Sequence, residues 1–273
     1  MARTSTTRRV GAGAFAVALV AGSAVLVVSR RHHNPPAPSC AVTSPSGQST
    51  YTLEVDQAAN SATIAAIGKK LGLPDHAVTV ALAAALQESN LHNLDYGDRD
   101  SLGLFQQRPS QGWGTAGEIL TPSYAAAAFF RELMKVDKWT QLPVTKAAQE
   151  VQRSGAPTAY AQWEDEARTL AIALTGESRE RLTCRFSLVR SRTSAPPSFA
   201  NAMRNELGVE SLGAAFGPAK GWAVASWLVA HAQQYRITRV SFLGREWRAS
   251  SGKWGAVKPA DGTIRVRQDP ATA

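Results

Sequence analysis

Hydrophobic residues in the middle of the chain recur at spacings of three and four, the pattern of helices that bury one face. Ile64, Ile67 and Leu71 show this spacing clearly. The dipeptide Thr121-Pro122 has the form of an N-cap followed by proline at the first helical position. We therefore expect helices with buried faces over residues 64–71, 78–89, 122–133, 145–154 and 158–175.

Alternation of apolar and polar residues, the pattern of a half-buried strand, appears near Tyr51 and Leu53. Residues 90–114 are polar and contain several glycines, which predicts a long loop between two helices. Beyond residue 198 both patterns occur. There we expect helices at 199–207 and 222–231 and strands at 237–242, 245–247 and 263–266.

An apolar segment near the start of the chain, Val10 to Val28, has 19 residues and no charge. As a helix it would reach ~28 Å, close to the thickness of a bilayer core. A cleaved signal peptide needs a shorter apolar region that ends in small residues. Ala21-Gly22-Ser23 has that character, but the apolar Val25 to Val28 still follows it. We expect an uncleaved signal anchor, with a cleaved signal peptide as the alternative.

Segments rich in Pro, Ser and Thr divide the rest of the chain, because such composition is typical of linkers. The expected organisation is a signal anchor at 1–31 with a transmembrane helix at 10–28, a linker at 32–49, a mainly helical domain at 50–184, a linker at 185–197 and a small basic α+β domain at 198–273.

The charged residues are unevenly distributed. Residues 1–40 carry a net charge of +5, residues 41–184 carry −4, and residues 185–273, with 13 basic and 5 acidic residues, carry +8. The acidic middle argues against a nucleic-acid-binding protein. The basic end indicates contact with an anionic surface, either a wall polymer such as a teichoic polymer or phospholipid headgroups. An ordinary solvated basic face has the same composition.

The two cysteines, Cys40 and Cys184, lie at the two borders of the helical domain. Outside the cytosol such a pair is typical of a disulfide that joins the first and last segments of a domain. Two buried thiols in a reduced protein are the alternative. Their separation of 144 positions excludes a redox CxxC motif and a zinc ribbon.

Glu88 is the most informative candidate for chemistry. It is the only carboxylate between Asp75 and Asp95, and it lies at the end of a helix made largely of Ala, Val and Leu. Burial disfavours the charged carboxylate, and the negative end of the helix dipole acts in the same direction, so we expect a raised pKa. A carboxyl group that stays protonated near neutral pH can donate its proton to a glycosidic oxygen. A solvent-exposed Glu at a helix end is the alternative.

The segment that follows resembles the lysozyme-like, soluble lytic transglycosylase superfamily. Members carry Glu-Ser at the end of a helix, an Asn-containing loop and then a Gly-Leu-Met-Gln block. This chain has Glu88-Ser89, Asn93 and Gly103-Leu104-Phe105-Gln106 in that order. The resemblance covers about residues 50–184, and 97–114 is similar to an actinobacterial branch of secreted or membrane-anchored proteins. It implies a mainly α fold: a lysozyme-like helical domain behind a single transmembrane helix, followed by a small α+β domain.

The resemblance implies roles for particular residues. Glu88 would be the catalytic acid, and Ser89 would orient it or bind the acetamido group of the sugar. The family's Ala-Tyr-Asn-x-Gly turn is absent, and Val151-Gln152-Arg153-Ser154 and Tyr160 occupy its region. Trp113, in a loop between two glycines, is a candidate for stacking on a sugar ring, with core packing as the alternative. The expected substrate-binding residues are Ser89, Asn93, Gln106, Gln107, Trp113, Gln152 and Tyr160.

A second carboxylate would decide the type of reaction. Hydrolysis requires a base or nucleophile at a defined distance from the acid, whereas in lytic transglycosylases one Glu acts as acid and then base. Asp98 and Asp100, in the loop after the helix, are the candidates, and ordinary turn chemistry is their alternative explanation. Both reaction types stay open at this point.

We expect neither a metal nor another cofactor. The spacing of Asp95, Asp98 and Asp100 lacks the register of an EF-hand, and the histidines show no ligand spacing. The expected function is cleavage of the glycan strands of peptidoglycan by a single-pass membrane protein whose bulk is extracellular. The alternative is a non-catalytic scaffold that binds the cell wall or belongs to the divisome.

Overall fold

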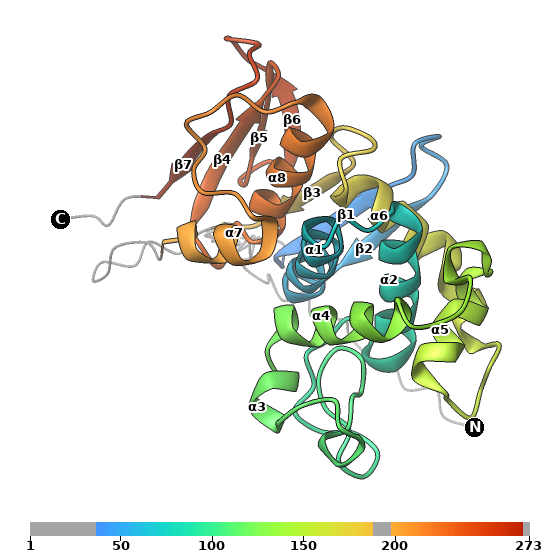
Figure 1. The fold of residues 1–273 in the computed structure, drawn as a ribbon. Coiled ribbons are helices and arrows are strands. Elements are labelled where there is room, and N and C mark those ends of the chain that lie inside the picture. Colours follow the sequence, from blue (N-terminus) through green and yellow to red (C-terminus); the bar gives the residue numbers. More distant parts are fainter. Residues whose placement is uncertain (1–36, 188–197, 270–273) are drawn as a thin grey trace, which may run out of the picture. The chain divides into compact units, whose positions relative to one another are not determined.

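The computed structural model describes residues 37–187 and 198–269, so the predicted transmembrane helix at 10–28 lies outside the described residues (Figure 1). Within the two described ranges, no helix has both the length and the apolar character needed to cross a membrane. Most of the predicted linker at 185–197 also lies outside them.

The first helices of the described part of the chain pack around one another because helix α2 is apolar on every side. Ala77, Val80, Leu82 and Ala85 have no exposed surface, although they point in different directions around the helix axis. A helix that is hydrophobic all round must be surrounded, and α2 contacts α1, α4, α5 and α6. The bounds are α1 Val55–Lys70, α2 Asp75–Ser89, α3 Ala116–Ile119, α4 Pro122–Leu133, α5 Val144–Gln152 and α6 Glu164–Leu174, with short 3₁₀ turns at Pro109–Gln111, Trp139–Gln141 and Ala159–Trp163.

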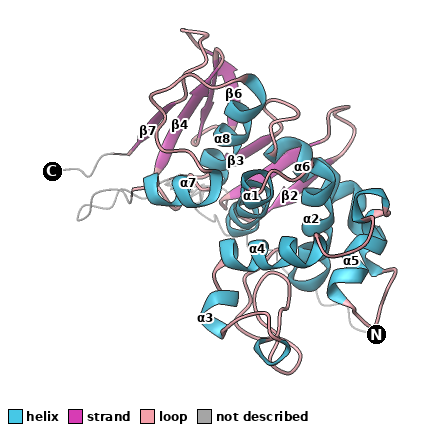
Figure 2. Cartoon of the chain, in the orientation of Figure 1, coloured by secondary structure: helices cyan, strands magenta, loops and turns pink. Residues whose placement is uncertain are grey.

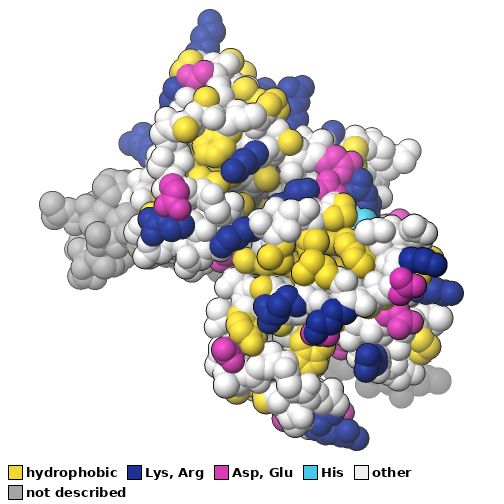
Figure 3. Space-filling model, viewed as in Figure 1, with side chains coloured by type: hydrophobic (Ala, Val, Ile, Leu, Met, Phe, Trp, Pro, Cys, Tyr) yellow, Lys and Arg dark blue, Asp and Glu magenta, His cyan; other side chains and the backbone are white. Residues whose placement is uncertain are grey.

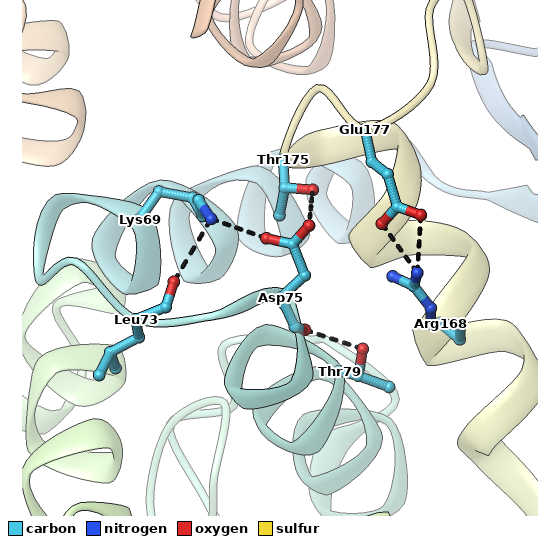
Figure 4. A network of polar contacts seen from close by, with 7 residues as sticks. All are labelled: Lys69, Leu73, Asp75, Thr79, Arg168, Thr175 and Glu177. Atoms are coloured by element: carbon cyan, nitrogen blue, oxygen red, sulfur yellow. Dashed lines mark hydrogen bonds and ion pairs between the residues drawn. The ribbon is translucent and has the colours of Figure 1, made fainter. Parts of the chain in front are cut away.

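A polar network fixes the first residue of α2 (Figure 4). Lys69 Nζ donates to Asp75 Oδ1 at 2.7 Å, and Thr175 Oγ1 donates to Asp75 Oδ2 at 3.1 Å. Lys69 lies in the last turn of α1 and Thr175 directly follows α6, so one carboxylate joins three helix ends. Beside it, Arg168 Nη2 lies 2.8 Å from each oxygen of Glu177.

A three-stranded antiparallel sheet closes this helical part. Its strands are β1 Ser39–Thr43, β2 Thr50–Leu53 and β3 Leu182–Arg185, in the order β2-β1-β3. The pairing of β1 with β3 joins segments from opposite ends of the helical part and places Cys40 opposite Cys184. The predicted disulfide between these two cysteines is present. Strand β1 falls within residues 32–49, which we expected to be a linker.

The second sheet has four antiparallel strands in the order β6-β5-β4-β7 (Figure 2). Helix α8, Pro218–Ala230, packs on β4. A Cβ atom on Gly221 of α8 would lie 2.0 Å from Phe242 of β4, so only glycine permits this close approach. The bounds of the last elements are α7 Ala200–Leu207, β4 Ile237–Phe242, β5 Arg245–Arg248, β6 Lys253–Ala256 and β7 Arg265–Gln268.

The hydrophobic core runs continuously from the helical part into the second sheet. Helix α8 contacts α1, α6 and β3. Trp247 Nε1 on β5 donates to the Cys184 carbonyl at 3.0 Å, and Ser226 Oγ on α8 donates to the Ala173 carbonyl at 2.8 Å. These bonds satisfy buried polar groups across the junction, and the two described ranges, 37–187 and 198–269, accordingly belong to one compact unit.

The expectation of a mainly α fold is wrong for the part of the chain that the structure describes. Helices account for 44% of the described residues and strands for 16%, and the strands form two antiparallel sheets, which makes the fold α+β. The error arose at β1, β3 and β6, which have four or five residues each. So short a strand carries almost no periodic signal, and the partner of β1 lies about 140 residues away in the chain.

Removal of the disulfide, by the double substitution Cys40→Ala/Cys184→Ala, should lower the free energy of unfolding by up to about 4 kcal/mol, because the crosslink closes a loop of 144 residues. Urea denaturation followed by circular dichroism measures this loss. Wild type treated with reductant should reach the same midpoint as the variant. An unchanged midpoint in both would contradict a stabilising crosslink.

Candidate functional site

Glu88 lies in the last turn of α2, where the helix leaves the core. The helix ends because Asn90 and Leu91 adopt left-handed backbone conformations, with φ of 51° and 63°. Asn90 tolerates this conformation well, whereas Leu91 is held there by complete burial of its side chain. The Glu88 side chain is therefore half-buried at a rigid helix end.

The closest partner of Glu88 is Tyr160. Its hydroxyl donates to Glu88 Oε1 at 2.7 Å, and the tyrosine, in the turn Ala159–Trp163, is completely buried. Burial raises the pKa of Glu88 above its ordinary value of 4.5, and the hydrogen bonds from Tyr160 and Gln152 oppose that rise in pKa. Burial also raises the pKa of Tyr160, so its hydroxyl stays a donor.

Gln152, at the end of α5, contacts the acid and the loop after α2 at the same time. Its Nε2 donates to the Phe105 carbonyl at 2.9 Å, and its side chain also hydrogen-bonds to Glu88. Sequence analysis placed Gln152 and Tyr160 in the cleft wall only through the region they occupy. The structure brings both of them to Glu88.

Ser89 is buried and its hydroxyl is already engaged. Ser89 Oγ lies within hydrogen-bond distance of two carbonyl oxygens, 2.8 Å from Leu104 and 3.1 Å from Ala85. This side chain holds the Gly103-Leu104 loop against the end of α2. Its observed role is to position the loop.

Three more of the expected substrate-binding residues donate to backbone carbonyls, one of which, that of Ala125, lies in α4. Asn93 Nδ2 donates to the Leu120 carbonyl at 2.7 Å, and Gln107 Nε2 donates to the Ala125 carbonyl at 3.2 Å. Gln107 is only 1% exposed. Gln106 Nε2 donates to the Tyr96 carbonyl at 3.3 Å. Their amide groups therefore shape the loop next to Glu88.

The two candidate second carboxylates lie in different surroundings. Asp98 is exposed over 93% of its side chain and lies 3.9 Å from Arg99 Nε. Asp100 accepts from Ser110 N at 2.8 Å and from Arg108 Nε at 2.7 Å. Hydrogen bonds from Ser110 and from the Arg108 guanidinium lower the pKa of Asp100, so it is ionised and engaged within its own loop.

A groove of about 740 Å³ lies between the ends of α4 and α5 and the loop at Trp113. Gln152 and Trp113 both line it, so two expected site residues meet here, whereas Glu88 is not one of its lining residues. Sequence analysis missed three carboxylates that line the groove, because they are far apart in the chain and on separate elements: Glu132, Asp137 and Glu150.

Sequence analysis also missed Gln87, which precedes the acid. Its Oε1 accepts from Trp163 Nε1 at 2.8 Å and from Gln162 Nε2 at 3.1 Å. Glu88 and Gln87 thus both bind side chains of the turn Ala159–Trp163, which fixes the end of α2 against that turn. No spacing signal in the sequence connects these residues.

Glu54, Asp56 and His92 offer one ligand atom each within 4.8 Å of one another, the one such group found in the described ranges. His92 Nδ1 lies 3.1 Å from Asp56 Oδ2, and both carboxylates are exposed. These residues are the candidates should the chain hold a metal ion.

Comparison with protein-family models and with curated proteins gives no match to this chain.

Glu88→Gln should raise the melting temperature at neutral pH. The folded-state pKa of Glu88 lies above its ordinary value of 4.5, so ionisation of this group costs stability as the pH rises through that folded-state pKa. Below 4.5 the carboxyl is neutral in both states, and the gain should disappear. Thermal melts of both proteins across this pH range measure the difference, and a gain that grows toward acid pH would contradict it.

Proposed function

We propose that this protein cleaves the glycan strands of peptidoglycan, with Glu88 as the general acid. The observation that carries the proposal is a half-buried carboxyl group with a raised pKa at a fixed helix end, 2.7 Å from a buried tyrosine hydroxyl. Raised carboxyl pKa values in a partly apolar setting are the requirement for proton donation to a glycosidic oxygen. The resemblance of Glu88-Ser89 and the Gly103–Gln106 block to lytic transglycosylases supports the same assignment.

The proposed reaction begins with the protonated Glu88. Its proton passes to the glycosidic oxygen as the bond from that oxygen to the anomeric carbon breaks. Glu88 is then a carboxylate, and the hydroxyl of Tyr160 donates a hydrogen bond to it. The carboxylate next accepts a proton from the attacking hydroxyl, which regenerates the acid.

The attacking hydroxyl belongs either to the substrate or to water. An attack by the substrate's own hydroxyl gives an anhydro sugar and needs no second carboxylate. Asp98 is exposed and Asp100 is bound within its loop, so neither has the surroundings of a base poised for water. We therefore favour the lytic transglycosylase over the muramidase. The groove carboxylates Glu132, Asp137 and Glu150 are the candidates for a base if the products carry reducing ends.

A non-catalytic wall-binding or divisome scaffold is the second candidate function. The observation that favours it is the engagement of Ser89, Asn93 and Gln107 with backbone carbonyls, which leaves fewer polar groups for a sugar. On this proposal the groove would bind glycan without turnover.

The substitution Glu88→Gln should reduce the release of soluble fragments from purified sacculi by at least about 100-fold, the lower range for loss of a general acid. Binding to sacculi should persist. The matched control Glu210→Gln changes an exposed carboxylate of an ion pair and should retain activity.

Mass analysis of the fragments separates the reaction types, since anhydro ends weigh one water less than reducing ends. Binding of wild type without release of any fragment would favour the scaffold.

Tyr160→Phe should shift the alkaline limb of the pH–rate profile to higher pH and lower the maximal rate. The tyrosine hydroxyl lowers the pKa of Glu88, so its removal raises that pKa and keeps the acid protonated to higher pH. The rate falls because the carboxylate loses a positioning hydrogen bond. A shift of the alkaline limb to lower pH, measured on sacculi, would contradict this role.

A further inference from the structure

The second sheet carries four basic residues in one row. Arg239 of β4 pairs with Arg248 of β5 and with Arg267 of β7, and Arg248 pairs with Lys253 of β6. Every strand of the sheet therefore contributes one cation at the same level. With neighbouring strands ~4.8 Å apart, the four positions extend over roughly 14 Å.

The row lies on the face of the sheet opposite helix α8. The neighbouring residues Val240 and Trp247 are completely buried and Val266 is half-buried, because side chains alternate between the two faces. Arg239 and Arg248 expose 41% and 55% of their side chains. The row is thus the outer surface of the sheet.

Like charges placed opposite one another destabilise a sheet, and this row is only partly neutralised. Glu246 lies 2.8 Å from Arg248 Nε and 3.6 Å from Arg239 Nη1. Arg267 and Lys253 have no carboxylate partner among the residues that the structure describes. By contrast, basic and acidic side chains are interspersed on the face seen in Figure 3.

Two hollows follow the row. The larger, of about 460 Å³, is lined by Arg239, Arg248 and Arg267 together with the hydroxyl-bearing Thr238, Ser187 and Ser250. One carboxylate, Asp269, also lines it and lies 3.8 Å from Arg236 Nη2. The smaller, of about 150 Å³, is lined by Arg248, Lys253 and Glu246. Arg248 borders both, so a chain lying along the row would have room at successive cations.

We infer that this row binds a linear polymer of phosphodiester-linked units of the teichoic type. Four cations at regular spacing match a ligand with regularly repeated negative charges, and guanidinium groups bind phosphate oxygens in pairs. The inference is independent of glycan cleavage at Glu88.

Single-stranded nucleic acid has the same backbone chemistry, but it is normally held by aromatic side chains that stack on the bases. The strand positions that share the row's face contain no aromatic residue: Arg239, Ser241, Glu246, Arg248, Lys253, Gly255, Arg265 and Arg267. The Cys40–Cys184 disulfide also favours a compartment outside the cytosol, where wall polymers occur.

The test measures binding of fluorescently labelled poly(glycerol phosphate) to the full-length chain by anisotropy at several salt concentrations. Arg239→Gln/Lys253→Gln/Arg267→Gln should bind at least about tenfold more weakly at low salt. In this triple variant the slope of log affinity against log salt should decrease in magnitude by about 2, since each lost phosphate contact of a single strand contributes ~0.7. The matched control Lys138→Gln/Lys146→Gln/Lys220→Gln removes three exposed lysines elsewhere and should bind as wild type does.

Equal weakening in the triple variant and its control would overturn the inference, because binding would then depend on net charge alone. Tighter binding of oligothymidylate or of anionic phospholipid vesicles, with the same dependence on the row, would overturn it in favour of nucleic acid or membrane.

If the triple variant does not fold, the double variant Lys253→Gln/Arg267→Gln replaces it in the binding test. This variant leaves the two arginines near Glu246 intact. It should lose about half of the salt dependence. Glu88→Gln should bind the polymer as wild type does, which separates this site from the proposed catalytic one.

Discussion

The burial of α2 on all sides is the constraint on which the rest of the structure depends. Its alanines, valines and leucines make contact with four other helices, so the helix has one position and one orientation. Asp75 fixes its beginning through Lys69 and Thr175. The other end is fixed by the left-handed turn at Asn90 and by the hydroxyl of Ser89, and Glu88 is therefore presented from a rigid element.

The same burial determines the electrostatics of the candidate site. A carboxyl group at the end of a surrounded helix loses much of its hydration, which raises its pKa. Tyr160 and Gln152 oppose that rise without removing it, and they also fix the direction of the carboxyl group. A group of this kind can hold a proton and release it at one place, which general acid catalysis requires.

In the second sheet, strand pairing brings together basic residues that are separated in the sequence. The net charge of residues 185–273 indicated a basic surface, but the alignment of Arg239, Arg248 and Arg267 depends on strand register. The opposite face of this sheet packs on α8, so the three arginines share the outer face of the sheet. Register converts scattered basic residues into a row.

The sequence by itself determined the helices of the middle part, the polar loop, the disulfide partners and the choice of Glu88. These features follow from local periodicity and from residue types that have few alternatives. Only the tertiary structure decided that the fold is α+β, since β1 and β3 are short and pair across about 140 residues. It also decided that Ser89, Asn93 and Gln107 bind backbone, whereas Tyr160 and Gln152 meet the acid. The sequence gives the type of a polar side chain but not its hydrogen-bond partner, because the partner depends on which distant elements pack beside that side chain.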